Sequence, residues 1–179
     1  KELCEKPGRK YIYAYWPSPD DLLHEFGGAN EQCDKIKDFI TDVESRVAEF
    51  TREMKDTLLV ITADHGHFTT KVSQLEDYPE LIATFERMPA IEPRLATFFI
   101  KKGMKREFTK LFTDIYGDSF ELYTKEGALS KNLFGTGKVH EKFRDMLGDY
   151  IAVATDDITL VHTVKADWAS AHGGMYPSE

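Results

Sequence analysis

The sequence predicts an α/β fold, because two apolar strand-like segments enclose one long amphipathic helix. Residues 9–16 are β-branched and aromatic and stop at Pro17, which is typical of a buried strand. Residues 57–63 form a short apolar run that predicts a central strand of a parallel sheet. Apolar residues spaced three and four apart predict a helix over about 30–55, with Asn30 as its N-cap. We expect this strand–helix–strand unit to have a right-handed crossover.

The middle of the chain, residues 76–136, predicts an inserted β-α-β or cap segment. Residues 1–75 and 137–179 are then expected to form the α/β core that carries the metal-binding residues. A single continuous domain is the alternative. The elements expected after residue 76 are strands at 95–100, 120–123, about 150–154 and about 157–163, and helices at about 103–116 and about 140–147.

The composition limits the partners that the protein can have. With 41% apolar and 30% charged residues, the 179-residue chain resembles an ordinary soluble globular protein. No apolar run approaches the ~20 residues that a membrane span needs, so no membrane partner is expected. The net charge of −8 argues against a nucleic-acid duplex as the main partner. Cys4 and Cys33 are expected to be free thiols in a reducing cytoplasm, with a disulfide between them as the alternative.

Carboxylates and histidines gather in three short segments near expected strand ends. In the first segment Asp20 and His24 are four residues apart, so one helical turn places both on the same side. Such a pair can chelate one cation. The alternative interpretation is that Asp20 caps a short helix and His24 is a surface residue.

The second segment follows the strand at 57–63 directly and contains Asp64 and His65. Gly66 permits a tight turn there, and a carboxylate beside an imidazole suits zinc, or manganese if further oxygen ligands join. The alternative is a turn in which Asp64 bonds its own backbone. The third segment has His172 before two glycines, on a backbone that is free to approach a ligand, and a plain loop histidine is the alternative.

Taken together, the segments predict one nearly complete metal site and half of another. Asp20, His24 and His172 form a three-ligand set with an open position, which is typical of catalytic rather than structural zinc. Asp64 and His65 supply only two ligands for a second ion. We therefore expect residues outside this chain to complete the second site.

The three motifs resemble those of the type I phosphodiesterase and nucleotide pyrophosphatase family of the alkaline phosphatase superfamily. The matching patterns are Asp-x-x-x-His-x-x-Gly at 20–27, Thr-Ala-Asp-His-Gly at 62–66 and His-Gly-Gly-x-x-Pro-x-Glu at 172–179. The resemblance covers nearly the whole chain. It implies an alkaline-phosphatase-like three-layer α/β/α sandwich with a mostly parallel sheet, here without its N-terminal part.

The resemblance also implies roles for the candidate ligands. Residues matching Asp20, His24 and His172 bind one metal, and those matching Asp64 and His65 bind the other, beside an upstream Asp and a nucleophilic Thr or Ser. Neither upstream residue has a candidate in this chain, which begins without Met and looks cut at both ends. We therefore expect no catalytic nucleophile here, an inactive fragment, and an exposed sheet edge covered by an oligomer or by the missing N-terminal half.

The implied activity is hydrolysis of a small-molecule phosphoester with two divalent metal ions, zinc as the first expectation and manganese as the second. His67 is the next candidate, as a contact to a metal ligand or to the substrate, with an exposed loop histidine as the alternative. Other superfamily activities are alternatives: phosphomonoesterase, phosphonate hydrolase, sulfatase or phosphomutase. A different class, a metal-free binding or structural domain, remains a further alternative.

Overall fold

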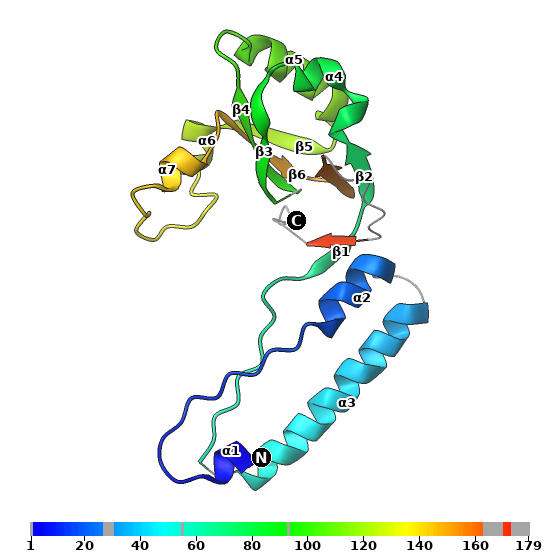
Figure 1. The fold of residues 1–179 in the computed structure, drawn as a ribbon, viewed down its shortest axis with the longest axis vertical. Coiled ribbons are helices and arrows are strands. Elements are labelled where there is room, and N and C mark those ends of the chain that lie inside the picture. Colours follow the sequence, from blue (N-terminus) through cyan, green and yellow to red (C-terminus); the bar gives the residue numbers. More distant parts are fainter. Residues whose placement is uncertain (1, 27–30, 55, 93, 163–169, 173–179) are drawn as a thin grey trace.

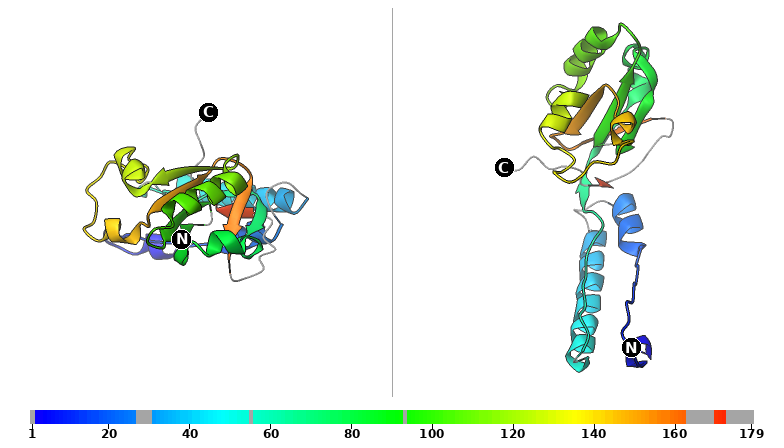
Figure 2. Two further views of the ribbon diagram at one scale, coloured as in Figure 1. Left: turned by 90° about the horizontal axis from the view of Figure 1, so that it is seen from above. Right: turned by 90° about the vertical axis from the view of Figure 1, so that its left-hand side faces the viewer.

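The structure is a computed structural model that describes residues 2–26, 31–54, 56–92, 94–162 and 170–172. Figure 1 shows an elongated part, which contains the first three helices, and a compact part, which contains most of the strands. Figure 2 shows that the elongated part projects away from the compact part. The predicted N-cap Asn30 lies outside the described residues.

The elongated part contains helices but no strand among the described residues. Its helices are α1 (Glu2–Glu5), α2 (Ser18–Phe26) and α3 (Glu31–Glu53). The length of α3 confirms the helix predicted over 30–55. The two strands predicted at 9–16 and 57–63 are wrong in this structure, because both segments are extended chain without a strand partner.

The physical reason for this correction is that a strand needs a neighbour to accept and donate its backbone hydrogen bonds. The side chains of Tyr11 and Leu58 are 90% and 87% exposed, so the apolar patterns that predicted burial meet no covering surface here. The apolar patterns indicate that these segments are suited to pack against other residues, and the described part of the chain leaves these side chains largely exposed.

The compact part is built on a four-stranded antiparallel sheet with the order β3-β4-β6-β5. Its strands are β3 (Phe85–Glu92), β4 (Leu95–Ile100), β5 (Phe120–Thr124) and β6 (Tyr150–Ala154). Its helices are η1 (Leu75–Asp77), α4 (Pro79–Ile82), α5 (Lys105–Tyr116), α6 (Lys125–Ser130) and α7 (Phe143–Met146). These bounds confirm the strands expected at 95–100, 120–123 and about 150–154 and the helix expected at about 103–116. The helix expected at about 140–147 is shorter, and the sequence did not predict β3, α4 or α6. Because β6 pairs with β4 and β5, the sheet joins strands from both sides of the predicted domain boundary, which itself stays a prediction.

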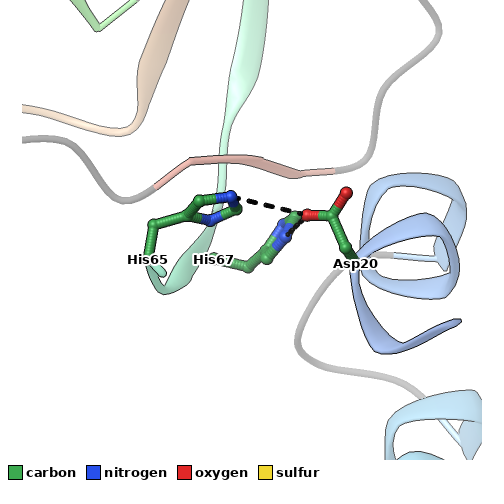
Figure 3. Close-up of side chains that lie close together, drawn as sticks. All are labelled: Asp20, His65 and His67. Carbon is green, nitrogen blue, oxygen red and sulfur yellow. Dashed lines mark hydrogen bonds and ion pairs between the residues drawn. The ribbon is translucent and has the colours of Figure 1, made fainter. Parts of the chain in front are cut away.

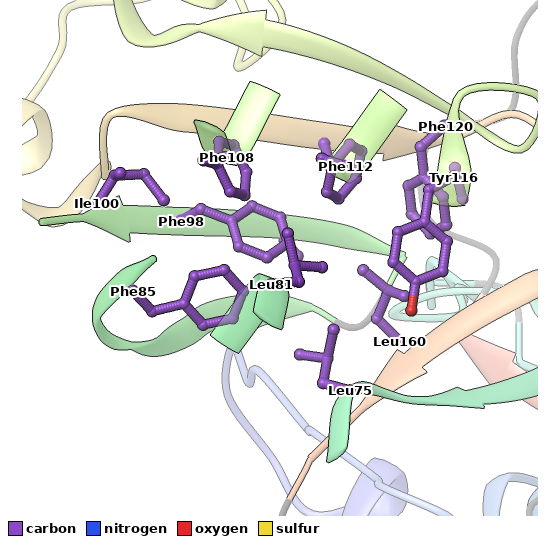
Figure 4. Close-up of a cluster of buried hydrophobic side chains, with 13 residues drawn as sticks. Leu75, Leu81, Phe85, Phe98, Ile100, Phe108, Phe112, Tyr116, Phe120 and Leu160 are labelled. Atoms are coloured by element: carbon purple, nitrogen blue, oxygen red, sulfur yellow. The ribbon is translucent and has the colours of Figure 1, made fainter. Parts of the chain in front are cut away.

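Aromatic rings form the centre of the core between α5 and the sheet (Figure 4). Phe98 on β4 and Phe108 on α5 are completely buried, with ring centroids 5.2 Å apart. Phe112, one helical turn further along α5, is 5.3 Å from Phe98. Rings at these separations contribute about 0.5–1.5 kcal/mol per pair beyond their burial. The aromatic core therefore gives the compact part a stable base for the segments attached to it.

Two short strand pairs connect this base to the elongated part. The strands β2 (Lys71–Gln74) and β7 (Ile158–Val161) pair in parallel, and β1 (His67–Thr69) pairs antiparallel with β8 (Ser170–His172). In the described residues the parallel pairing expected for the sheet is thus limited to β2 and β7. The α/β class is confirmed, with both parallel and antiparallel ladders.

Asp149 links the compact sheet to α5 and makes stability depend on pH. Its carboxylate lies 2.6 Å from the Lys105 ammonium and accepts a 2.9 Å hydrogen bond from the Ile100 amide. Partial burial raises the pKa of Asp149, but these two partners together hold that pKa below its ordinary value of 3.8. A carboxyl with a lowered pKa stabilises the fold above its unfolded-state pKa, and this contribution is lost as the pH falls through the folded-state value.

We therefore predict that Asp149→Asn will unfold with a weaker pH dependence than the wild type. Urea unfolding from about pH 6 to about pH 3 measures this difference, and the wild type should lose more free energy of unfolding over that range. Asp145→Asn, at an exposed position on α7, is the matched control and should follow the wild type. Parallel curves for wild type and Asp149→Asn would contradict the prediction.

Within the described part of the chain, no helix has the length and apolar composition that crossing a membrane requires. Cys4 on α1 is a free thiol, as predicted, whereas the side chain of Cys33 lies outside the described residues.

Candidate metal centre

Asp20 and His24 lie one turn apart on α2, close to the junction with β1. His24 Nε2 is 3.7 Å from Asp20 Oδ1, so the four-residue spacing brings both side chains together as predicted. The helix begins at Ser18, and the Asp20 amide donates to the Pro17 carbonyl in its first turn. The Asp20 side chain is 40% exposed and therefore accessible to an ion from solvent.

The second segment bends at Asp64 and is irregular at His65 and Gly66, so the tight turn expected at Gly66 stays a prediction. Asp64 is 71% exposed, and its Oδ1 accepts a 3.1 Å hydrogen bond from the His65 amide. This is the own-backbone contact that the alternative interpretation of Asp64 predicts. His65 Nε2 lies 3.8 Å from Asp64 Oδ2 and also 3.8 Å from Asp20 Oδ1. His65 therefore stands between the two predicted ligand sets.

His67 is the residue that approaches Asp20 most closely among these histidines. Its Nε2 is 2.7 Å from Asp20 Oδ1, and its side chain is only 8% exposed (Figure 3). The His67 ring also lies edge-on to His24, with centroids 4.6 Å apart. The sequence predicted His67 as a contact to a metal ligand or to the substrate. The two-residue spacing of His65 and His67 is the signal that could have grouped them, because alternate side chains of an extended chain point to the same side.

The charge states of the Asp20–His67 pair follow from its surroundings. The hydrogen bond from His67 lowers the pKa of Asp20 below its ordinary value of 3.8. Burial lowers the pKa of His67 below 6.5, and this effect exceeds the opposing one of its bond to Asp20. At neutral pH the carboxylate is thus ionised and can only accept, so neutral His67 donates from Nε2. Neutral imidazole and ionised carboxylate are the forms that bind metals.

His172 is placed only through its backbone. In the β1–β8 ladder it stands directly opposite His67, which brings the first residue of the third motif next to β1. The side chain of His172 and the rest of its motif lie outside the described residues. Its predicted role as a ligand therefore stays a prediction.

Three side chains come close enough together to hold one cation. One ligand atom each from Asp20, His65 and His67 lies within 4.8 Å of the others. One carboxylate oxygen and two imidazole nitrogens are donor types that a divalent cation takes. His24 borders this cluster, and Asp64 borders it through His65. The division of these residues between two ions stays a prediction.

A match between the sequence and one known protein family establishes the family of this chain. The type I phosphodiesterase / nucleotide pyrophosphatase profile matches residues 2–175, nearly the full chain. The chain belongs to this family. No curated protein matches the sequence significantly.

Solved structures of ectonucleotide pyrophosphatase / phosphodiesterase 5 (NPP5) share the fold of this family member. The murine protein superposes with a TM-score of 0.66 at 20% sequence identity, and the human protein with 0.66 at 21%. A third structure is an inactive variant of the murine protein in complex with AMP, again with a TM-score of 0.66. Each match covers 90% of this chain but 42% of the NPP5 chain. These matches confirm the alkaline-phosphatase-like fold, of which this chain spans less than half the length.

Proposed function

We propose that this chain is the metal-binding portion of a two-metal phosphoester hydrolase. The observation that carries the proposal is the convergence of Asp20, His65 and His67 on one point in a member of this family. Asp20 comes from α2, whereas the two histidines come from the segment that begins β1. One carboxylate and two imidazoles are donor types that a divalent cation takes.

The proposed roles keep the two ligand sets of the family pattern. Asp20, His24 and His172 would hold one ion, and Asp64 and His65 would hold the other. His65 lies 3.8 Å from Asp20, so members of the two proposed ligand sets are close neighbours. When bound, two divalent cations supply charge neutralisation for the phosphoryl oxygens and activation of the attacking and leaving oxygens. Zinc fits the donor set best, with manganese as the second choice.

His67 has a separate part in this proposal. In the described structure its Nε2–H holds the Asp20 carboxylate in one orientation. A ligand that is held by a second group binds its ion more tightly than one that is free to rotate. His67 therefore keeps Asp20 aimed toward His65, and it is also near enough to serve as a third ligand.

We further propose that polypeptide beyond these 179 residues supplies the nucleophile and covers the elongated part. The family nucleophile has no candidate in the sequence, and the NPP5 structures are more than twice as long as the region matched. The extended segments 9–16 and 57–63 expose large apolar side chains, such as Tyr13 at 74% and Val60 at 73%. Unpaired apolar chain of this kind is suited to pair as strands within a larger sheet.

A groove beside α3 supports the same covering polypeptide. The groove has a volume of about 330 Å³. Its apolar lining residues are Trp16, Leu22, Phe26, Ile36 and Phe39. Trp16 and Phe39 meet edge-to-face at 4.7 Å, and yet Phe39 remains 50% exposed. An apolar surface of this kind is normally buried against another segment, and a second copy of this chain is the alternative occupant.

The substrate proposed is a small nucleotide phosphoester. The AMP bound in the murine NPP5 structure favours a nucleotide over the sulfate and phosphonate esters of the wider superfamily. Phosphomonoesterase and phosphomutase activities remain alternatives, because the nucleophile region chooses between them.

Two measurements on the 179-residue chain and on the longer polypeptide test the proposal. Titration calorimetry with Zn²⁺ should show binding to both, and only the longer polypeptide should hydrolyse bis-p-nitrophenyl phosphate with added Zn²⁺ or Mn²⁺. Robust turnover by the 179-residue chain alone would contradict the proposed external nucleophile. The absence of Zn²⁺ binding to either protein would favour the metal-free structural alternative.

A further inference from the structure

Arg94 is a buried cation where the compact part meets the metal centre. It is only 3% exposed and lies between β3 and β4. Its Nη1 donates to the carbonyl oxygens of Asp156 and Ile158, both at 2.8 Å. Burying a guanidinium is costly unless its N–H groups find acceptors, and these two carbonyls accept from Nη1. Arg94 thereby fixes the turn that joins β6 to β7.

The same guanidinium also contacts the strand that carries His67. The Arg94 guanidinium carbon lies 5.0 Å from the centroid of the Phe68 ring, within the range of a cation–π interaction. Successive side chains of a strand point to opposite faces. Phe68 therefore faces Arg94 while His67, its neighbour on β1, faces Asp20. A shift of Phe68 has to move His67 with it.

The start of β2 is attached to the turn region that Arg94 fixes. The Lys71 amide donates to the Asp157 carbonyl at 2.6 Å, and Thr159 Oγ1 donates to Thr70 Oγ1 at 2.8 Å. The chain that leaves β1 is thus held at Thr70 and Lys71. Phe68 is the point at which β1 itself contacts the Arg94 side chain.

We propose that Arg94 is a positioning residue for the metal centre, acting through Phe68 to keep His67 within bonding distance of Asp20. This inference rests on the proposed metal-binding function. The strand β1 has three residues and pairs with β8 alone in the described structure, and an isolated two-stranded ladder is only marginally stable. A brace on its other face is needed to hold the 2.7 Å contact between His67 and Asp20.

Two variants separate this role from a merely structural one. Arg94→Met removes the cation, and Phe68→Leu removes the aromatic ring but leaves the two carbonyl contacts of Arg94 in place. If Arg94→Met fails to fold, Phe68→Leu still tests the brace. Arg87→Met is the matched control, because Arg87 lies 3.5 Å over the Phe99 ring on the pair β3–β4 and not on β1, β8 or α2.

The first readout is the imidazole NMR signal of His67 in the metal-free protein, assigned by its loss in His67→Gln. Arg94→Met and Phe68→Leu should both shift this signal, and Arg87→Met should not. The second readout is Zn²⁺ affinity. Both variants should weaken it about tenfold, which is the smallest effect typical of replacing a residue that orients a metal ligand. Circular dichroism and thermal melts check that each variant is folded.

The possible results distinguish the positioning role of Arg94 from metal binding itself. Shifted His67 signals with weaker Zn²⁺ binding support the brace. His67 signals that match those of Arg87→Met in both variants would overturn it, whatever the affinity for Zn²⁺. If the wild type binds no Zn²⁺, the metal-binding proposal fails, and the His67 signal still decides whether Arg94 positions that residue.

Discussion

Replacing Asp20 by asparagine is expected to weaken Zn²⁺ binding by more than about 100-fold, because a direct ligand is lost. Loss of a residue that only orients a ligand weakens metal binding by about 10- to 100-fold. Asp20 is the centre of the cluster, with nitrogens of His24, His65 and His67 within 3.8 Å of its Oδ1. The amide of Asp20→Asn keeps the shape of the side chain but removes the negative charge that the cation requires.

Titration calorimetry of wild type and Asp20→Asn at neutral pH measures this change. Asp21→Asn is the matched control, because Asp21 is the adjacent residue on α2 and its side chain is exposed. The control should bind Zn²⁺ as the wild type does. Equal affinity of Asp20→Asn and wild type would remove Asp20 from the ligand set. Since Asp20 is 40% exposed, the substitution should leave the fold intact, which a thermal melt verifies.

Gly148→Ala is expected to produce the largest loss of stability, about 3 kcal/mol, at the upper end for overpacking a buried site. A Cβ at Gly148 would lie 2.2 Å from the Phe98 carbonyl oxygen and 2.9 Å from Thr97 Oγ1. The Gly148 amide donates to that same Thr97 hydroxyl at 2.6 Å. Backbone atoms of β4 cannot rotate away as a flexible side chain would. The added methyl group must therefore displace a central strand.

A thermal melt tests this expectation directly. A loss of this size corresponds to a fall in Tm of roughly 6–12 °C, since each kcal/mol changes Tm by about 2–4 °C in a chain of this length. Gly137→Ala is the control, because a Cβ there meets nothing within 4 Å, and its stability should stay within about 0.5 kcal/mol of the wild type. A Tm for Gly148→Ala equal to that of the control would show that β4 adapts.

The local elements were largely predictable, and the strand partners were not. Periodic apolar residues predicted α3 and α5, because an amphipathic helix is stabilised by its own hydrogen bonds and by one apolar face. The same kind of pattern predicted strands at 9–16 and 57–63, and there it failed. A strand pattern indicates that a segment is suited to pairing, but a strand forms only when a second segment pairs with it. That second segment can lie far away in the sequence or outside it.

The candidate metal centre likewise has features that the sequence predicts and features that only the folded chain shows. The sequence by itself determined the types and spacing of the ligands: one helical turn joins Asp20 to His24, and Asp64 and His65 are adjacent in the next motif. Only the tertiary structure decided that His67 is the closest partner of Asp20 and that Arg94 stacks against the neighbouring Phe68. Spacing along a helix or turn is fixed by local backbone geometry. Contacts between α2, β1 and the β3–β4 turn depend instead on how the whole chain packs.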